Sequence, residues 1–170
     1  KRYFQVLTPG ATNVGGTEAL GPGITQLAHT PALPVDADNI SVTSRVSPTL
    51  APVGTVTMKY RVNYAAEVSV QMFDDGAHGD GPAGDGVFGA TIPAGASTPG
   101  QMVRYYVTAS DNAAHSTREP LFIEPTTTPE YQGTVIAAPS VTTTLPQLLW
   151  FVQNPAAAET DAGTQCSVFF

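Results

Sequence analysis

The sequence predicts an all-β fold, an antiparallel β-sandwich with extended flanking segments. Three observations favour it. Apolar and polar residues alternate with a period of two along several short runs, as they do in strands with one buried face. The counts of Gly 16 and Pro 15, together with many threonines and valines, are typical of strands joined by turns. No long amphipathic helical pattern separates the runs.

Composition narrows the classes of partner. With 12% charged residues and a net charge of -7, the chain offers no basic face for phosphates, so nucleic acid is not an expected partner. A hydrophobic content of 42% indicates a packed core, and a single cysteine excludes an intrachain disulfide bond. No apolar run approaches the roughly 20 residues that span a bilayer, and no signal peptide is visible. Because the chain lacks an initial methionine and ends on an apolar run, we interpret it as part of a longer protein.

The chain divides into three predicted regions. Residues 1–23 form a linker at the end of a preceding domain, because they are rich in Gly, Pro and Thr from residue 7 and show no periodicity. Residues 24–128 form the sandwich. Residues 129–170 form a connector, followed by either the start of a further domain or extra strands.

Alternation identifies the strands of the sandwich. They are expected at 39–46, 55–62, 68–72, 86–93, 102–110 and, as a proline-bounded edge strand, 118–125. The positions expected to face inward are Ile40, Val42, Val46, Val56, Met58, Tyr60, Val62, Val68, Val70, Met72, Val103, Tyr105, Val107 and Ala109. Six or seven short strands at regular spacing favour a sandwich of immunoglobulin or fibronectin-III type.

The pattern changes after the sandwich. A short strand is expected at 133–137. Residues 147–152 are a continuous apolar run, which is typical of a strand buried on both faces, although the rest of the chain can barely supply that cover. Asn154 followed by Pro155 fits the cap and first turn of a short helix. Residues 166–170 begin a further strand.

One loop concentrates much of the acidity. Four aspartates and five glycines lie within the thirteen positions of residues 74–86. Glycines let the backbone fold back and turn its carbonyls inward, and calcium takes six to eight oxygen ligands. Without a cation, four carboxylates this close would repel one another. We therefore predict that the loop binds calcium as a cofactor, with the metal ligands Asp74, Asp75, Asp80 and Asp85.

Other roles for this loop are weaker. The main alternative is a solvated Gly/Asp turn whose aspartates accept hydrogen bonds from the backbone. His78 is expected to be an exposed loop residue, because calcium prefers oxygen, and zinc would need more nitrogen or sulfur ligands. The pattern G-x-G-x-x-G occurs at residues 79–84, but a strand rather than a helix follows it, and Asp80 and Asp85 would repel a pyrophosphate.

No catalytic constellation is evident. The histidines His29, His78 and His115 fall in predicted loops or strand ends, and no nucleophile elbow, Walker loop or zinc-protease motif occurs. Paired carboxylates also suggest a glycosidase, but a Gly-rich loop would hold such a pair poorly at a fixed separation. Cys166 lies in an apolar strand context that predicts a buried, inert thiol. We therefore predict no catalytic residues and no enzyme.

Residues 68–94 and 100–114 resemble a bacterial immunoglobulin/fibronectin-III-like module of large secreted and surface proteins. In such proteins the module often lies between a lamin-tail-like domain and a CotH-type kinase domain. Residues 2–13 are similar to the end of a lamin-tail-like domain. The stretches similar to the opening of a CotH-like kinase domain are 131–139, 145–155 and 167–170. The family's catalytic residues lie beyond the chain, so the resemblance implies none here.

These observations predict a non-catalytic spacer module of an exported multidomain bacterial protein, secreted or at the cell surface. Its partners would be the neighbouring domains of the same parent chain. A first alternative is a self-assembling fibre or surface-layer subunit, whose apolar terminal strands pair with another sheet edge. A second is a fragment of a CotH-like kinase protein that lacks its catalytic part.

Overall fold

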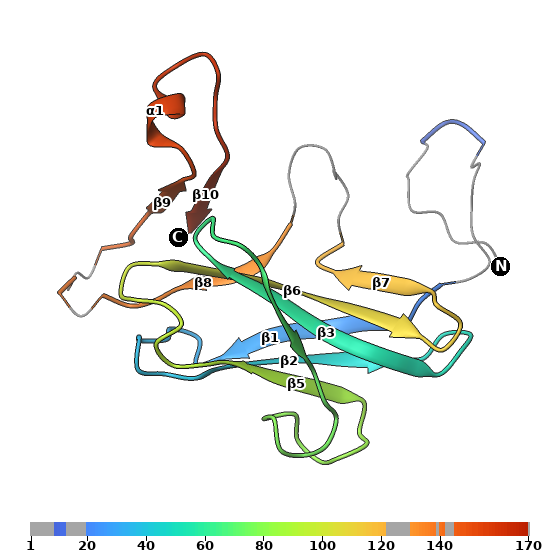
Figure 1. Cartoon of the computed structure of the whole chain (residues 1–170). Coiled ribbons are helices and arrows are strands. Elements are labelled where there is room, and N and C mark those ends of the chain that lie inside the picture. Colours follow the sequence, from blue (N-terminus) through green and yellow to red (C-terminus); the bar gives the residue numbers. More distant parts are fainter. Residues whose placement is uncertain (1–8, 13–19, 122–129, 139, 142–144, 170) are drawn as a thin grey trace.

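Two antiparallel sheets form the body of the molecule (Figure 1). The computed structural model describes residues 9–12, 20–121, 130–138, 140–141 and 145–169. The three-stranded sheet has the order β1 (Gly23–Thr30), β2 (Ile40–Ser47), β5 (Val87–Ile92). In the five-stranded sheet β4 (Val68–Gln71), β3 (Val53–Val62) and β6 (Met102–Asp111) are neighbours, and both β7 (Ser116–Glu119) and β8 (Gln132–Val135) pair with β6.

The core lies between these sheets and follows the predicted alternation. Burial alternates strictly along β2 from Ile40 to Val46 and along β6 from Val103 to Asp111. Side chains at alternate positions of a strand point to the same face, so each of these strands sends one row inward. Most of the predicted inward positions are buried: Ile40, Val42, Val46, Val56, Met58, Tyr60, Met72, Val103, Tyr105, Val107 and Ala109. Val62 and Val70 are only partly buried, and Val68 on the short edge strand is 45% exposed.

Strand β1 was not expected as a strand from the sequence. Apart from Gly23, its residues lie inside the predicted sandwich region, but their burial does not alternate cleanly. The reason is an irregularity in its pairing with β2 between Thr25 and Ala28, where Gln26 takes a positive φ of 54°. A bulge of this kind interrupts the period of two and also makes an edge strand a poor template for a further strand.

The other edge of the five-stranded sheet differs from the prediction. The predicted edge strand 118–125 begins earlier, as β7, and residues 122–129 lie outside the described part of the chain. β8 pairs with β6 over Met102 to Tyr105, beside the stretch that pairs with β7. Ile136, just after β8, is 1% exposed in the core. β8 is therefore one of the extra strands allowed after residue 128, and it belongs to the sandwich sheet.

A separate hairpin ends the described chain. β9 (Leu149–Val152) pairs only with β10 (Cys166–Phe169) among the described strands, and α1 (Pro155–Ala158) lies between them. Asn154 caps α1 as predicted, accepting a hydrogen bond from the Ala157 amide. Two other predictions were wrong. Trp150 is 68% exposed, so β9 is not buried on both faces, and Cys166 is exposed rather than buried. A two-stranded sheet has too few neighbours to cover both faces. Within the described residues, no helix has the length and apolarity to cross a membrane.

A side-chain hydrogen bond joins the two sheets. The Tyr105 hydroxyl on β6 lies 2.8 Å from Nδ1 of His29 on β1, and Tyr105 is 1% exposed. Burial lowers the pKa of His29, against a smaller raising effect of the Ala32 backbone, and burial raises the pKa of Tyr105. This bond therefore links a neutral imidazole to a neutral phenol inside the molecule.

We expect Tyr105→Phe to lower the free energy of unfolding by about 1–2 kcal/mol, because it leaves a partly buried ring nitrogen without a partner. Urea unfolding measures this effect. The control is Tyr106→Phe, which removes the same hydroxyl from an exposed bond to Glu67. Equal losses in the two variants would contradict a special role for the bond between the sheets.

Candidate functional site

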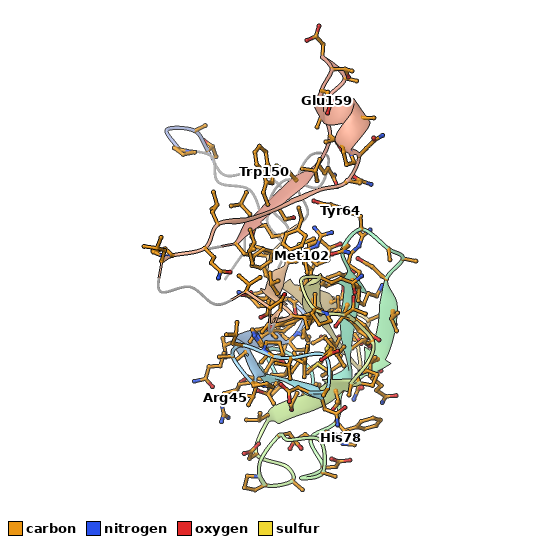
Figure 2. The ribbon with its side chains drawn as sticks, turned by 90° about the vertical axis from the view of Figure 1, so that its left-hand side faces the viewer. Arg45, Tyr64, His78, Met102, Trp150 and Glu159 are labelled. Atoms are coloured by element: carbon orange, nitrogen blue, oxygen red, sulfur yellow. The ribbon has the colours of Figure 1, made fainter. Side chains whose placement is uncertain are left out.

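The predicted acidic loop joins β4 to β5 at one end of the sandwich. Its base is fixed on both sides: Met72 is buried, and Phe73 exchanges backbone hydrogen bonds of 3.0 and 2.8 Å with Gly89. His78 lies at the end of the molecule opposite Trp150 and its hairpin (Figure 2). The loop is thus anchored on the core while its tip projects away from the rest of the chain.

Asp80 organises the first half of this loop. It is 3% exposed, and its carboxylate accepts three backbone hydrogen bonds. The amides of Asp75 and Gly76 donate to Oδ2 at 2.8 and 2.9 Å. The amide of His78 donates to Oδ1 at 2.9 Å. The hydrogen bond from the Gly76 amide is the largest of the effects that lower the pKa of Asp80. A carboxylate with three amide donors favours its charged form.

Asp74 organises the second half of the acidic loop in the same way, by accepting hydrogen bonds from backbone amides. The amides of Gly84 and Asp85 donate to its Oδ1 at 2.7 and 3.2 Å, and the amide of Gly86 donates to Oδ2 at 2.9 Å. Asp85 accepts a local hydrogen bond from the Val87 amide at 2.8 Å. The two halves of the loop are therefore closed by separate carboxylates, each of which binds backbone amides that the turn would otherwise leave unpaired.

Asp75 pairs with His78. Its Oδ1 lies 2.8 Å from His78 Nδ1 and also accepts a hydrogen bond from the Ala77 amide at 3.0 Å. The bond to His78 is the main reason that the pKa of Asp75 is lowered. The His78 ring also packs against Phe73, with ring centroids 5.0 Å apart. The His78 ring is therefore packed on one side, while its side chain remains 38% exposed in the loop.

The structure thus uses all four predicted ligands as hydrogen-bond acceptors. Two centres result, one at Asp80 and one at Asp74. Throughout the described part of the chain, no three His, Cys, Asp or Glu side chains gather so that they could hold a metal ion. This arrangement favours the alternative raised from the sequence, a turn held by aspartate–amide bonds. Calcium binding at this loop stays a prediction.

A third aspartate of this kind was missed from the sequence. Asp111, at the turn between β6 and β7, accepts hydrogen bonds from the amides of Ala113 and His115, both at 2.9 Å. Its Oδ2 lies 2.9 Å from Nδ1 of His115. Burial raises the pKa of Asp111, but the hydrogen bonds from His115 and Ala113 outweigh it and lower that pKa overall. An aspartate at the end of a strand, followed by Asn-Ala-Ala-His, was the available signal.

These lowered pKa values predict a loss of stability in acid. A carboxyl whose pKa is lower in the folded state stabilises the fold at pH values above its unfolded pKa, about 3.9, and loses that effect as the pH falls through the folded value. The pKa values of Asp75, Asp80 and Asp111 are all lowered in the folded state, so each of them contributes in this direction. His29 adds to it, because its lowered pKa means that protonation below about pH 6.5 favours the unfolded chain. We expect the melting temperature to fall slightly below pH 6 and steeply below pH 4.

Thermal unfolding followed by circular dichroism between pH 7 and pH 3 measures this dependence. In Asp80→Asn the drop between pH 5 and pH 3 should be smaller than in the unchanged chain, because one of the contributing carboxyls is absent. A melting temperature at pH 3 equal to that at pH 6 would contradict the assignment of these aspartates.

The fold, together with the acidic loop that its aspartate–amide bonds close, defines an immunoglobulin-like domain. In this class of domain two antiparallel sheets enclose one core. Within that class, residues 32–114 match the family described as the conditioned medium factor 2nd Ig-like domain. The matched range runs from before β2 through the acidic loop to the turn after β6, so it includes Asp74, Asp80 and Asp111. No curated protein matches the chain. The match does not reach the hairpin, so the CotH-type context stays a prediction.

Proposed function

We propose that this chain is a non-catalytic spacer module that holds its neighbours apart in an exported multidomain bacterial surface protein. An immunoglobulin-like all-β fold is typically non-catalytic, and the similarity to an Ig-like domain supports a structural module. The exported setting follows from the resemblance of residues 68–94 and 100–114 to modules of secreted and surface proteins.

The observation that carries the proposal is the placement of the two chain segments that flank the sandwich. A Cβ on Gly21 would lie 2.6 Å from the Ser116 backbone, so the segment entering β1 lies beside the Asp111 end of β6. The C-terminal hairpin contacts Arg104, near the other end of β6. The six residue steps from Arg104 to Ser110 span about 20 Å in a strand. Figure 1 accordingly places the start of β1 and the β9–β10 hairpin at opposite ends of the sandwich.

The hydrogen bonds inside the acidic loop and the β6–β7 turn also support a spacer role. Asp74 and Asp80 each accept hydrogen bonds from three backbone N–H groups, and Asp111 accepts two and also contacts the His115 ring, so both of these turns are held by internal bonds. Turns with internal hydrogen bonds open less readily than turns whose backbone bonds only water, so they keep the ends of a β-sandwich in place. A module of this kind transmits a fixed distance between its neighbours.

Distances between spin labels test the spacer. In a Cys166→Ser background, one pair joins Thr25→Cys on β1 with Gln132→Cys on β8, and a second joins Thr25→Cys with Glu159→Cys in the hairpin. All three labelled positions are exposed. We expect narrow distance distributions for both pairs. A broad distribution for the second pair alone would show that the hairpin does not keep a fixed place, and the spacer role would then be contradicted.

Self-assembly is a second candidate, favoured by one observation. The hairpin carries Trp150 and Val168, which are 68% and 49% exposed and directly opposite each other in the β9–β10 pairing. Sedimentation velocity distinguishes the two candidates. A monomer of 17.7 kDa at high concentration supports the spacer, whereas a concentration-dependent rise in mass that Trp150→Ser abolishes supports assembly.

A further inference from the structure

A groove lies between the five-stranded sheet and the C-terminal hairpin. It has a volume of about 470 Å³ and is lined by Arg104, Pro120, Glu130, Tyr131, Gln132, Ser167, Val168 and Phe169. Figure 2 shows Tyr64 at this junction, between the sandwich and the hairpin that carries Trp150. The groove is at the opposite end of the molecule from the acidic loop, so it is separate from the site described above.

The hairpin closes one wall of the groove through few contacts. The Tyr64 hydroxyl donates a hydrogen bond to the Phe151 carbonyl at 2.9 Å. Arg104 Nη1 donates to Ser167 Oγ at 3.3 Å, a long distance for a charged donor. The Phe169 ring lies close to Gly133, where a Cβ would come within 3.2 Å of it. These contacts leave room for a small molecule beside Arg104.

Two arginines meet at this point, and no carboxylate among the described residues pairs with either of them. Arg61 on β3 and Arg104 on β6 are direct cross-strand neighbours. Like charges in such a pair are destabilising. In the described part of the chain neither arginine forms an ion pair, and the Nε atom of each is buried without a hydrogen-bond partner. Burial first, and then the charge of Arg61, lowers the pKa of Arg104. A chain with 14 acidic and 7 basic residues has nevertheless placed two cations together.

The Arg104 side chain is held in a way that leaves donors available. Its guanidinium stacks on the rings of Tyr64 and Tyr131, 4.7 and 5.0 Å from their centroids. Stacking uses the face of the guanidinium and leaves the N–H groups at its edge. Of those, Nη2 donates to the Asn63 carbonyl at 2.7 Å, and Nη1 has only the long contact to Ser167 among the described residues. A planar acceptor can therefore replace or supplement Ser167 at Nη1.

We infer that this groove binds a small monocarboxylate with an apolar body, and that Arg104 receives the carboxylate while Arg61 adds to the positive potential. A carboxylate matches the planar guanidinium edge. Gln132 and Ser167 offer further polar groups, and Val168 and Phe169 offer an apolar wall. Glu130 also lines the groove, and its charge disfavours a phosphate dianion more than a single carboxylate.

The test compares two probes that differ only in the charged group, N-acetyl-leucine and N-acetyl-leucine amide. Each is titrated into the whole ¹⁵N-labelled chain and followed by amide chemical shifts. We expect N-acetyl-leucine to shift the signals of Tyr131, Gln132 and Ser167 at millimolar concentration, and its amide to leave them in place. Inorganic phosphate should bind at least tenfold more weakly.

Three variants test the role of Arg104. Arg104→Gln should weaken binding of N-acetyl-leucine at least tenfold, which corresponds to the loss of one charge-assisted hydrogen bond. Lys59→Gln removes a positive charge from the same strand as Arg61 outside the groove, and it should change the affinity less than twofold. Arg104→Lys keeps the positive charge at this position. For every variant, unchanged amide signals from the β2 and β5 strands confirm that the chain is folded. Equal binding of acid and amide, binding of phosphate alone, or unchanged binding by Arg104→Gln would each overturn the inference.

Discussion

Replacing Asp80 by asparagine is expected to lower the melting temperature by about 5 °C or more. Asparagine has one acceptor oxygen where the carboxylate has two, so it can satisfy Asp75 and Gly76 or His78, but not all three amides. Its own NH₂ group would then face an N–H donor at the remaining position. The variant also removes the charge that strengthens these bonds. Because Asp80 is almost fully covered by the loop, water cannot easily replace the lost acceptor.

Thermal unfolding of Asp80→Asn and Asp85→Asn measures this effect against a matched control. Both variants remove one negative charge from the same loop. Asp85 is exposed and accepts one local amide bond, so its replacement should change the melting temperature by less than about 2 °C. Similar effects at the two positions would mean that net charge, rather than the amide bonds of Asp80, determines the stability of the loop.

The second large effect is expected for Gly89→Ala. Gly89 on β5 lies directly beneath the acidic loop, and a Cβ there would come within 2.3 Å of the His78 carbonyl oxygen and 3.1 Å of the Asp80 Cβ. The atoms in the way include backbone, so relief requires the loop to move as a unit. We expect a loss of about 2–3 kcal/mol in the free energy of unfolding, the usual cost of forcing an added methyl group into a packed site.

Gly23→Ala is the matched control for Gly89→Ala. Gly23 is also a strand glycine, but a Cβ there would have its nearest neighbour, the Ser47 carbonyl oxygen, at 4.0 Å. Its replacement should change the free energy of unfolding by no more than about 0.5 kcal/mol in urea unfolding. If Gly89→Ala behaved like this control, the close packing of the loop on β5 would be wrong.

The sandwich could be predicted because its strands carry the signal in their own residues. β2, β3 and β6 alternate over eight to ten residues, and burial follows that alternation. β1 could not be predicted in the same way, because the bulge near Gln26 interrupts its period. The exposed face of β9 could not be predicted either. The sequence of an apolar run does not show whether other parts of the chain pack on it. The exposure of Trp150 therefore depends on tertiary structure alone.

The sequence predicted where the acidic loop lies, but not how its carboxylates and backbone amides are arranged. Four aspartates near many glycines are compatible with an ion held at the centre or with amides held around each carboxylate, and spacing does not separate the two. The decisive feature is where the chain reverses. Gly76 takes a positive φ of 76°, and the turn there directs the amides of residues 75, 76 and 78 toward Asp80. Asp111 also accepts hydrogen bonds from the amides of its turn, but no cluster of aspartates marks that turn in the sequence, so its role was missed.

The carboxylate–amide bonds of Asp74 and Asp80 are what close this loop. Amide hydrogen exchange by NMR tests it directly, first in excess chelator and then in millimolar calcium. We expect the amides of Gly76, His78, Gly84 and Gly86 to exchange at least about 100-fold more slowly than in a free chain already in chelator, with no change on adding calcium. Exchange at free-chain rates in chelator, with protection appearing only after calcium is added, would contradict it and would instead support a calcium site at Asp74, Asp75, Asp80 and Asp85.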